Sequence, residues 1–220
     1  MKIGRAQHIR ANAEGVVKAA EVILEGGLIV YPTDTTYAVG VNALNADAVQ
    51  KVWELKGRSA SKAMSVVLSE VSEVVRYADL SKREAAICAA LLPGPVTLLL
   101  RAAHEGTKLA CSGTTVGVRV PDSRFCCEVA SLASVPVTAT SANASGGAET
   151  YSLRDAIESL GPEASKVDLW VDGGNLNSTR PSTIIDLSCE PPTIVREGAL
   201  SRTDLDILLE AKGLGSLDTS

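Results

Sequence analysis

The feature that most constrains the fold of this chain is the alternation of short apolar runs with segments of helical spacing. The apolar runs are rich in Val, Ile and Leu and are bounded by Gly or Pro, which is typical of buried strands. The clearest of them span residues 28–31, 64–68, 96–100 and 116–120. Between the runs, apolar residues recur three or four positions apart, which predicts amphipathic helices. The clearest helical segments span residues 12–25, 81–92, 123–133 and 152–160.

Because strands and helices alternate along all 220 residues, we expect one α/β domain with helices on both faces of a mixed sheet. We find no internal repeat, low-complexity segment or linker to a second domain. Ser81, Ser152 and Thr203 are the residues that we expect to cap helices, Ser81 through a capping box with Glu84.

Composition excludes several classes of protein. The net charge of −5 argues against a generally basic nucleic-acid binder, although a local basic concavity stays open. Aromatic residues make up only 3% of the chain, which argues against platforms that stack single-stranded bases. The apolar runs are too short to span a bilayer and no signal peptide precedes them, so we expect a cytoplasmic protein without a membrane partner. The five cysteines and two histidines lack metal-ligand spacing, so we expect no protein-held metal.

The stretch from residue 26 to residue 69 holds the first candidate site. Its buried strand is followed by Thr33, Thr35 and Thr36 around Asp34, and its helical segment ends at the basic sequence 56–58. In open α/β sheets, ligands bind outside the carboxyl ends of the strands. Hydroxyl groups and cations at such an end indicate a pocket for a small polar anion. An ordinary strand–helix–strand unit with a polar turn explains the same pattern.

Hydroxyl, amide or arginine side chains recur at the ends of later strands. They occur at Thr115 and Arg119, at Ser141 and Asn143, at Ser182 and Thr183, and at Arg196. Arginine binds carboxylate or phosphate through two parallel hydrogen bonds, and lysine binds phosphate as a point charge. The set suits phosphoryl or nucleotidyl transfer, in which positioning and charge stabilisation supply the catalysis. Neither the P-loop nor the dinucleotide-binding glycine motif is present, and each residue taken singly is also an ordinary turn or cap former.

Taken together and in order, these segments resemble the YrdC family, the threonylcarbamoyl-adenylate synthases. The matching segments are Tyr31-Pro32-Thr33-Asp34-Thr35-Thr36-Tyr37, Leu55-Lys56-Gly57-Arg58, Pro93-Gly94-Pro95-Val96-Thr97, Val118-Arg119-Val120-Pro121, Ser141-Ala142-Asn143, Ser182-Thr183-Ile184-Ile185-Asp186 and Arg196-x-Gly198. The resemblance covers about residues 12–200 and is to the short form of the family. It implies a single YrdC-like domain, with a twisted, mixed, open sheet, helices on both faces and a large concave cleft. It further implies that residues 12–200 form the catalytic domain and residues 201–220 a C-terminal helix and frayed tail.

The family condenses L-threonine, bicarbonate and ATP into threonylcarbamoyl-AMP and releases pyrophosphate. The resemblance implies the same substrates here, with Mg²⁺ accompanying ATP and no tightly bound cofactor. A separate threonylcarbamoyl transferase complex would place the product on the adenosine beside the anticodon of tRNA, and tRNA itself is a further candidate partner. The catalytic residues implied are Lys56, Arg58, Ser141 and Asn143. Those implied for ATP are Arg58, Lys62, Thr115, Ser141, Glu149 and Arg196. Those implied for threonine are Thr35, Arg119, the backbone at Ala139, and Ser182.

The chain departs from the family pattern at several positions. Many relatives have histidine where this chain has Val67, so one polar contact near the threonine is missing. Lys62-Ala63 replaces the common Asn-Pro or Lys-Pro. The alternative to a synthase is a non-catalytic RNA-binding or ribosome-associated module on the same fold. The acidic charge and the low aromatic content count against that alternative.

Overall fold

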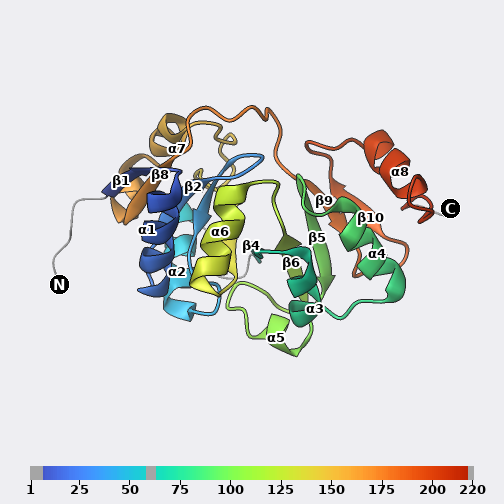
Figure 1. Ribbon diagram of the computed structural model, residues 1–220. Helices are drawn as coiled ribbons and strands as arrows, with labels where there is room; N and C mark the ends of the chain where they lie inside the picture. The colour runs from blue at the N-terminus through green and yellow to red at the C-terminus, as the bar shows by residue number, and fades with distance from the viewer. Residues whose placement is uncertain (1–6, 58–62, 218–220) are drawn as a thin grey trace.

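The structure, a computed structural model, describes residues 7–57 and 63–217 (Figure 1). Its described strands form one ten-stranded sheet in the order β1-β8-β2-β3-β7-β4-β6-β5-β9-β10. The strands are β1 (Gln7–Arg10), β2 (Ile29–Pro32), β3 (Tyr37–Gly40), β4 (Ser65–Val67), β5 (Val96–Arg101), β6 (Thr115–Arg119), β7 (Val137–Ser141), β8 (Leu169–Asp172), β9 (Thr183–Asp186) and β10 (Thr193–Arg196). Parallel pairs such as β4 with β6 alternate with antiparallel pairs such as β5 with β6, so the sheet is mixed as expected.

Eight helices lie among the described residues, and the six longer ones begin at side-chain caps that the sequence encodes. They are α1 (Ala13–Leu24), α2 (Ala46–Lys56), α3 (Val74–Tyr77), α4 (Lys82–Leu91), α5 (His104–Thr107), α6 (Arg124–Ala133), α7 (Leu153–Leu160) and α8 (Arg202–Glu210), with 3₁₀ turns at Val71–Glu73 and Gly161–Lys166. Capping boxes begin α4 at Ser81 and α7 at Ser152, as predicted. The prediction that Thr203 caps the last helix is wrong, because Ser201 accepts the hydrogen bond from the backbone N–H of Asp204.

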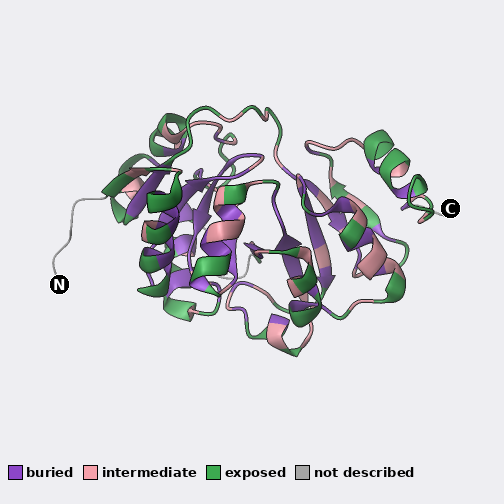
Figure 2. Ribbon diagram, in the orientation of Figure 1, coloured by how far each residue is buried: buried purple, intermediate pink, exposed green. Residues whose placement is uncertain are grey.

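Successive residues of the central strands point to opposite faces of the sheet and enter two separate cores. On β2, Ile29 and Tyr31 pack against the apolar faces of α1 and α6. Leu28 and Val30 point the other way, into a larger core that also holds apolar residues of α2, α4, α7 and α8. The buried interior runs through the strands in Figure 2, and the outer surfaces of the helices are exposed. Helices therefore cover both faces of the sheet, as the sequence predicts.

The two helices on the first face cover only half of the sheet. Helices α1 and α6 pack over the half that contains β8, β2, β3 and β7 (Figure 1). On the other half, the same face of the strands β4, β5, β6 and β9 lines a cavity, while the opposite face of these strands packs in the larger core. A candidate site therefore lies on a sheet face that no described helix covers, and not only at the ends of strands.

Several elements differ from the sequence expectations. Strand β3 forms an antiparallel hairpin with β2, so the predicted strand–helix–strand unit contains an additional strand. Strand β1 lies before residue 12 and forms one edge of the sheet beside β8. In the tail, Leu217 is buried in the same core as Leu205 and Leu209 of α8, so this part of the predicted frayed tail is packed. No helix among the described residues is long and apolar enough to cross a membrane.

Candidate active site

The cavity on the uncovered face has a volume of about 370 Å³. Its floor is made of β4, β5, β6 and β9, and its walls come from the end of β7, the loop after it, and β10. It is lined by Thr36, Ala63, Met64, Ser65, Thr97, Leu99, Arg119, Ala139, Thr140, Ser141, Asn143, Gly146, Gly147, Glu149, Pro181, Ser182, Ile184, Val195 and Arg196. These residues come from six strands and their connections, so the site exists only when the whole sheet is formed.

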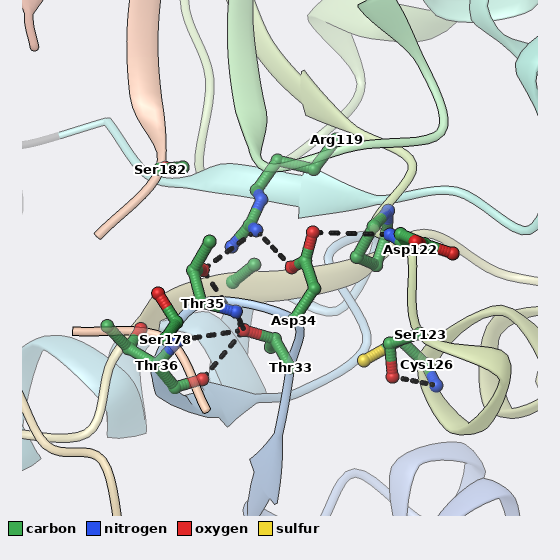
Figure 3. A network of polar contacts seen from close by, with 12 residues as sticks. Thr33, Asp34, Thr35, Thr36, Arg119, Asp122, Ser123, Cys126, Ser178 and Ser182 are labelled. Carbon is green, nitrogen blue, oxygen red and sulfur yellow. Dashed lines mark hydrogen bonds and ion pairs between the residues drawn. The ribbon is translucent and has the colours of Figure 1, made fainter. Parts of the chain in front are cut away.

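At one end of the cavity, Arg119 leaves the last position of β6. Its Nη2 donates to Asp34 Oδ1 at 2.7 Å and to Thr35 Oγ1 at 3.0 Å. Both partners belong to the tight turn between β2 and β3, which is held by the Thr33 hydroxyl donating to the carbonyl of Thr36 (Figure 3). The turn therefore places a carboxylate and a hydroxyl group within hydrogen-bond distance of one guanidinium.

Arg119 is almost completely enclosed, yet its guanidinium is not fully satisfied. The side chain is 5% exposed, and its Nε is buried without a hydrogen-bond partner among the described residues. An unpaired donor of this kind costs roughly 1–3 kcal/mol unless a ligand supplies the acceptor. Because Arg119 also lines the cavity, the geometry favours an anionic ligand such as a carboxylate.

A second cluster forms the turn that follows β7. The Lys56 ammonium, at the end of α2, donates to the carbonyl oxygens of Ser141 and Asn143, and to Asn143 Oδ1 at 3.1 Å. The Ser141 hydroxyl donates to the same Oδ1 at 2.7 Å. The Asn143 amide in turn donates to the carbonyl of Gly147 at 2.6 Å. Lys56 is buried, so it fixes the shape of this turn from behind, while Ser141 and Asn143 reach the cavity.

A third cluster lies on β10 and the segment before β9. Arg196 donates from Nε and Nη2 to the carbonyl of Ser182 and from Nη2 to its hydroxyl, and Nη1 lies 3.7 Å from Glu149 Oε1. The other Glu149 oxygen is buried without a partner among the described residues. Burial lowers the pKa of Arg196, although Glu149 opposes the change. This part of the cavity is therefore lined by a guanidinium and by the carboxylate that lies beside it.

Comparison with known proteins identifies the fold and the family. A family model for Sua5, YciO and YrdC proteins, described as telomere recombination, matches residues 21–198. The chain belongs to the Sua5/YciO/YrdC family. The threonylcarbamoyl-AMP synthase of Homo sapiens is 34% identical over 214 residues, which cover 93% of this chain and 75% of the human protein.

Solved structures of the Sua5/YciO/YrdC family share the fold. Sua5 of Pyrococcus abyssi, solved in complex with L-threonine, superposes with a TM-score of 0.83 at 29% identity. The match covers 94% of this chain but only 61% of that longer protein. YciO of Escherichia coli gives a TM-score of 0.79 at 25% identity and matches over 99% of its length. The expected single α/β domain with an open mixed sheet is thereby confirmed.

In this member of the Sua5/YciO/YrdC family, most of the predicted site residues meet at the one cavity. Those that line it are Arg119, Ala139, Ser141, Asn143, Glu149, Ser182 and Arg196. Thr35 lies behind Arg119 and does not line the cavity, and Lys56 lies behind the Ser141 turn. Thr115 is at the opposite end of β6 from Arg119 and also lies outside the lining. Arg58 and Lys62 fall outside the described residues, so their roles stay predictions.

Some polar residues that line the Sua5/YciO/YrdC cavity or contact its lining, among them Thr97, Ser65 and Asp34, escaped the sequence analysis as site residues. Thr97 lines the cavity and its hydroxyl lies 2.9 Å from that of Ser182. Ser65 also lines it and donates to the carbonyl of Ala139. A hydroxyl inside an apolar strand run was the available signal for both of them. Asp34 gave no signal, because an aspartate between threonines is typical of any tight turn.

Proposed function

We propose that this chain is an L-threonylcarbamoyladenylate synthase, which condenses L-threonine, bicarbonate and ATP to threonylcarbamoyl-AMP and pyrophosphate. The observation that carries the proposal is the cavity that two guanidinium groups line, Arg119 on β6 and Arg196 on β10. The human relative is named for this activity, and the Pyrococcus abyssi relative was solved with L-threonine. The match covers 61% of the Pyrococcus abyssi protein, so the activity that we assign to this chain is our proposal.

The amino acid is assigned to the Arg119 end. Arg119 lines the cavity, and its guanidinium suits the carboxylate of threonine. The carbonyl-rich strand end at Ala139 and the hydroxyl of Ser182 lie in the same cavity and would accept or donate to the remaining polar atoms. Val67, where many relatives have histidine, pairs with Arg119 in the sheet but is buried in the core under α1 and α6 and does not line the cavity.

The nucleotide is assigned to the end that holds Ser141, Asn143, Glu149 and Arg196. Arg196 offers positive charge to the phosphates, and the Ser141 hydroxyl oxygen, whose proton is donated to Asn143, lines the cavity in the turn built on Lys56. Arg58 and Lys62 would add to this charge. Mg²⁺ would enter with the triphosphate, because Mg²⁺ is commonly held by one or two carboxylates together with substrate phosphates. Glu149 is the one carboxylate among the described lining residues, and it is the group that fits this role.

The chemistry requires no nucleophile from the protein. The threonine amine combines with bicarbonate or CO₂ to form a carbamate, whose oxygen attacks the α-phosphorus of ATP and displaces pyrophosphate. Arg119 and Arg196 orient the two reactants and stabilise the developing charge within one cavity. The threonylcarbamoyl group would then pass to a separate transferase complex acting on tRNA, and the cytoplasm, where tRNA and ATP meet, is the location that we propose.

Pyrophosphate release from ATP tests this proposal when threonine and bicarbonate are added together, singly or not at all. We expect release to require both compounds, and mass spectrometry to detect threonylcarbamoyl-AMP. Release that is no greater with both than with neither would exclude the synthase. Salt-dependent binding of tRNA without any turnover would instead favour the RNA-binding alternative.

A further inference from the structure

Asp34 touches the cavity-lining Arg119 from the side that is turned away from the cavity. Asp34 does not line the cavity, and its side chain is only 8% exposed. We propose that Asp34 is a positioning residue, whose carboxylate holds the Arg119 guanidinium in the orientation that receives the amino-acid carboxylate. This inference rests on the proposed function and adds to it the residue that sets the geometry of the amino-acid end.

The two oxygens of Asp34 have different partners, and both partners are donors. Oδ1 accepts from Arg119 Nη2 at 2.7 Å, and Oδ2 accepts from the backbone N–H of Asp122 at 3.2 Å (Figure 3). A carboxylate accepts at both oxygens, whereas an amide has one acceptor and one donor. Asparagine at this position would therefore turn an N–H group toward Arg119 or toward the Asp122 N–H, whichever way it is oriented.

The same carboxylate joins the two halves of the sheet. Asp34 belongs to the β2–β3 turn, in the half covered by α1 and α6, while Arg119 and Asp122 belong to β6 and the loop after it, in the half that carries the cavity. Arg119 Nη2 donates hydrogen bonds to two residues of this turn, Asp34 and Thr35. Arg119 also lines the cavity, so the part of its side chain that reaches the cavity surface is left for a ligand.

Asp34 cannot reach the substrate to accept a proton from it. Both of its oxygens are occupied, and neither opens into the cavity. The titratable groups around it are Arg119 on β6, Asp122 after β6, Tyr31 on β2, and Cys126 and Cys127 on α6. Burial raises the pKa of Asp34, against the attraction of Arg119, and the thiols and the phenol beside it do not supply a second cation. Asp34 therefore acts on the substrate through Arg119, whose guanidinium it positions.

The test compares Asp34→Asn with Asp122→Asn in the pyrophosphate assay. Both variants remove one negative charge from the same neighbourhood, but the Asp122 side chain is exposed and its backbone N–H is retained. A guanidinium displaced by about 1 Å can lower efficiency by two orders of magnitude. For Asp34→Asn we expect the KM for threonine to rise by about 10- to 100-fold, with the KM for ATP within about twofold of wild type. For Asp122→Asn we expect both values to stay within about twofold of wild type.

Two further measurements keep the inference testable if Asp34→Asn does not fold. Asp34→Glu retains the charge and both acceptors but is one methylene longer, so we expect a threonine KM between those of wild type and Asp34→Asn, again with little change for ATP. Unchanged threonine KM in either Asp34 variant would overturn the inference. An equal rise in the KM values for threonine and ATP would overturn it as well, because it would indicate general loosening of the fold.

A structural readout separates this inference from the proposed function. In a crystal structure of the folded Asp34 variant we expect the Arg119 guanidinium to leave its position beside Thr35, whatever reaction the protein catalyses. A guanidinium that stays in place would contradict the positioning role even if the enzyme is a synthase. Wild-type protein that ignores threonine, combined with a displaced guanidinium in the variant, would contradict the proposed function alone.

Discussion

At the scale of single residues, burial decides which thiols can react. Cys88, Cys111 and Cys126 are buried, and burial raises the pKa of each thiol to about 12. Cys126 also donates its S–H to the carbonyl of Pro32, next to the Asp34 turn. Cys189, in the loop between β9 and β10, is exposed. The nucleophilic form of cysteine is the thiolate, so a buried thiol with a raised pKa is inert at neutral pH.

We therefore expect iodoacetamide at pH 8 to label Cys189 first and to leave Cys88, Cys111 and Cys126 unlabelled while the protein is folded. Peptide mass spectrometry after timed quenching measures this order, and labelling in denaturant provides the control in which all sites react. Labelling of Cys126 as fast as Cys189 would show that the region behind Arg119 opens readily in solution.

At the scale of one element, the turn after β7 depends on a lysine from α2. Lys56 and Ser141 are far apart in the sequence, yet the ammonium supplies hydrogen bonds to two carbonyl oxygens and to the Asn143 amide oxygen. Substitution by Met keeps much of the side-chain volume but removes these donors, so the buried acceptors lose their partners. The turn that presents Ser141 and Asn143 would then lose its defined shape.

For Lys56→Met we expect pyrophosphate release to fall by at least about tenfold and the free energy of unfolding to fall by about 1–3 kcal/mol. Lys18→Met on α1 is the matched control, because Glu21, which is exposed, is the one ion-pair partner of Lys18 within the described part of the chain, and such pairs contribute about 0–1 kcal/mol. Urea denaturation and the pyrophosphate assay measure the two effects. Full activity in Lys56→Met would contradict the dependence of the turn on this lysine.

At the scale of the whole molecule, the C-terminal helix belongs to the main core. Leu205 and Leu209 of α8 are fully buried, whereas Ile207 on the same helix is 61% exposed. Helix α8 packs against α4 (Figure 1), and Leu217 beyond it is buried in the same core. The main core thus continues beyond residue 200, the boundary that the family resemblance implied for the catalytic domain.

For Leu205→Ala we expect a loss of about 2–5 kcal/mol in the free energy of unfolding, as for other large-to-small substitutions in cores. Ile207→Ala, on the exposed side, should change the same quantity by less than about 0.5 kcal/mol. A single unfolding transition in urea should report both changes. If Leu205→Ala were no more destabilising than Ile207→Ala, the helix would be an appendage and not part of the domain.

The elements that the sequence revealed are those with a strong local signal. Apolar runs predicted β5 and β6, and the Ser81 and Ser152 boxes predicted the starts of α4 and α7. Strand β1 is polar and exposed at the edge of the sheet, so it carries no apolar pattern. Strand β3 is only four residues long and follows a tight turn, which hides it beside its hairpin partner.

The sequence could predict several residues that line the cavity, but not the contacts that hold them in place. The resemblance named Arg119, Ser141 and Arg196, and these residues do share one cavity. Nothing in the sequence distance of 85 residues between Asp34 and Arg119 indicates that their side chains meet. The same holds for Lys56, whose burial behind the Ser141 turn depends on where α2 ends relative to β7. Contacts of this kind follow from the completed sheet.

Because helices cover only half of one sheet face, alternate residues of a single strand meet different requirements, one set for the core and the other for the cavity. On β5, Val96, Leu98 and Leu100 belong to the core, while Thr97 and Leu99 form the cavity floor. A change at the second set alters what the cavity accepts without removing a residue from the core, and a change at the first set does the reverse. Substrate preference in this protein can therefore drift at every other residue of its central strands while the architecture stays constant.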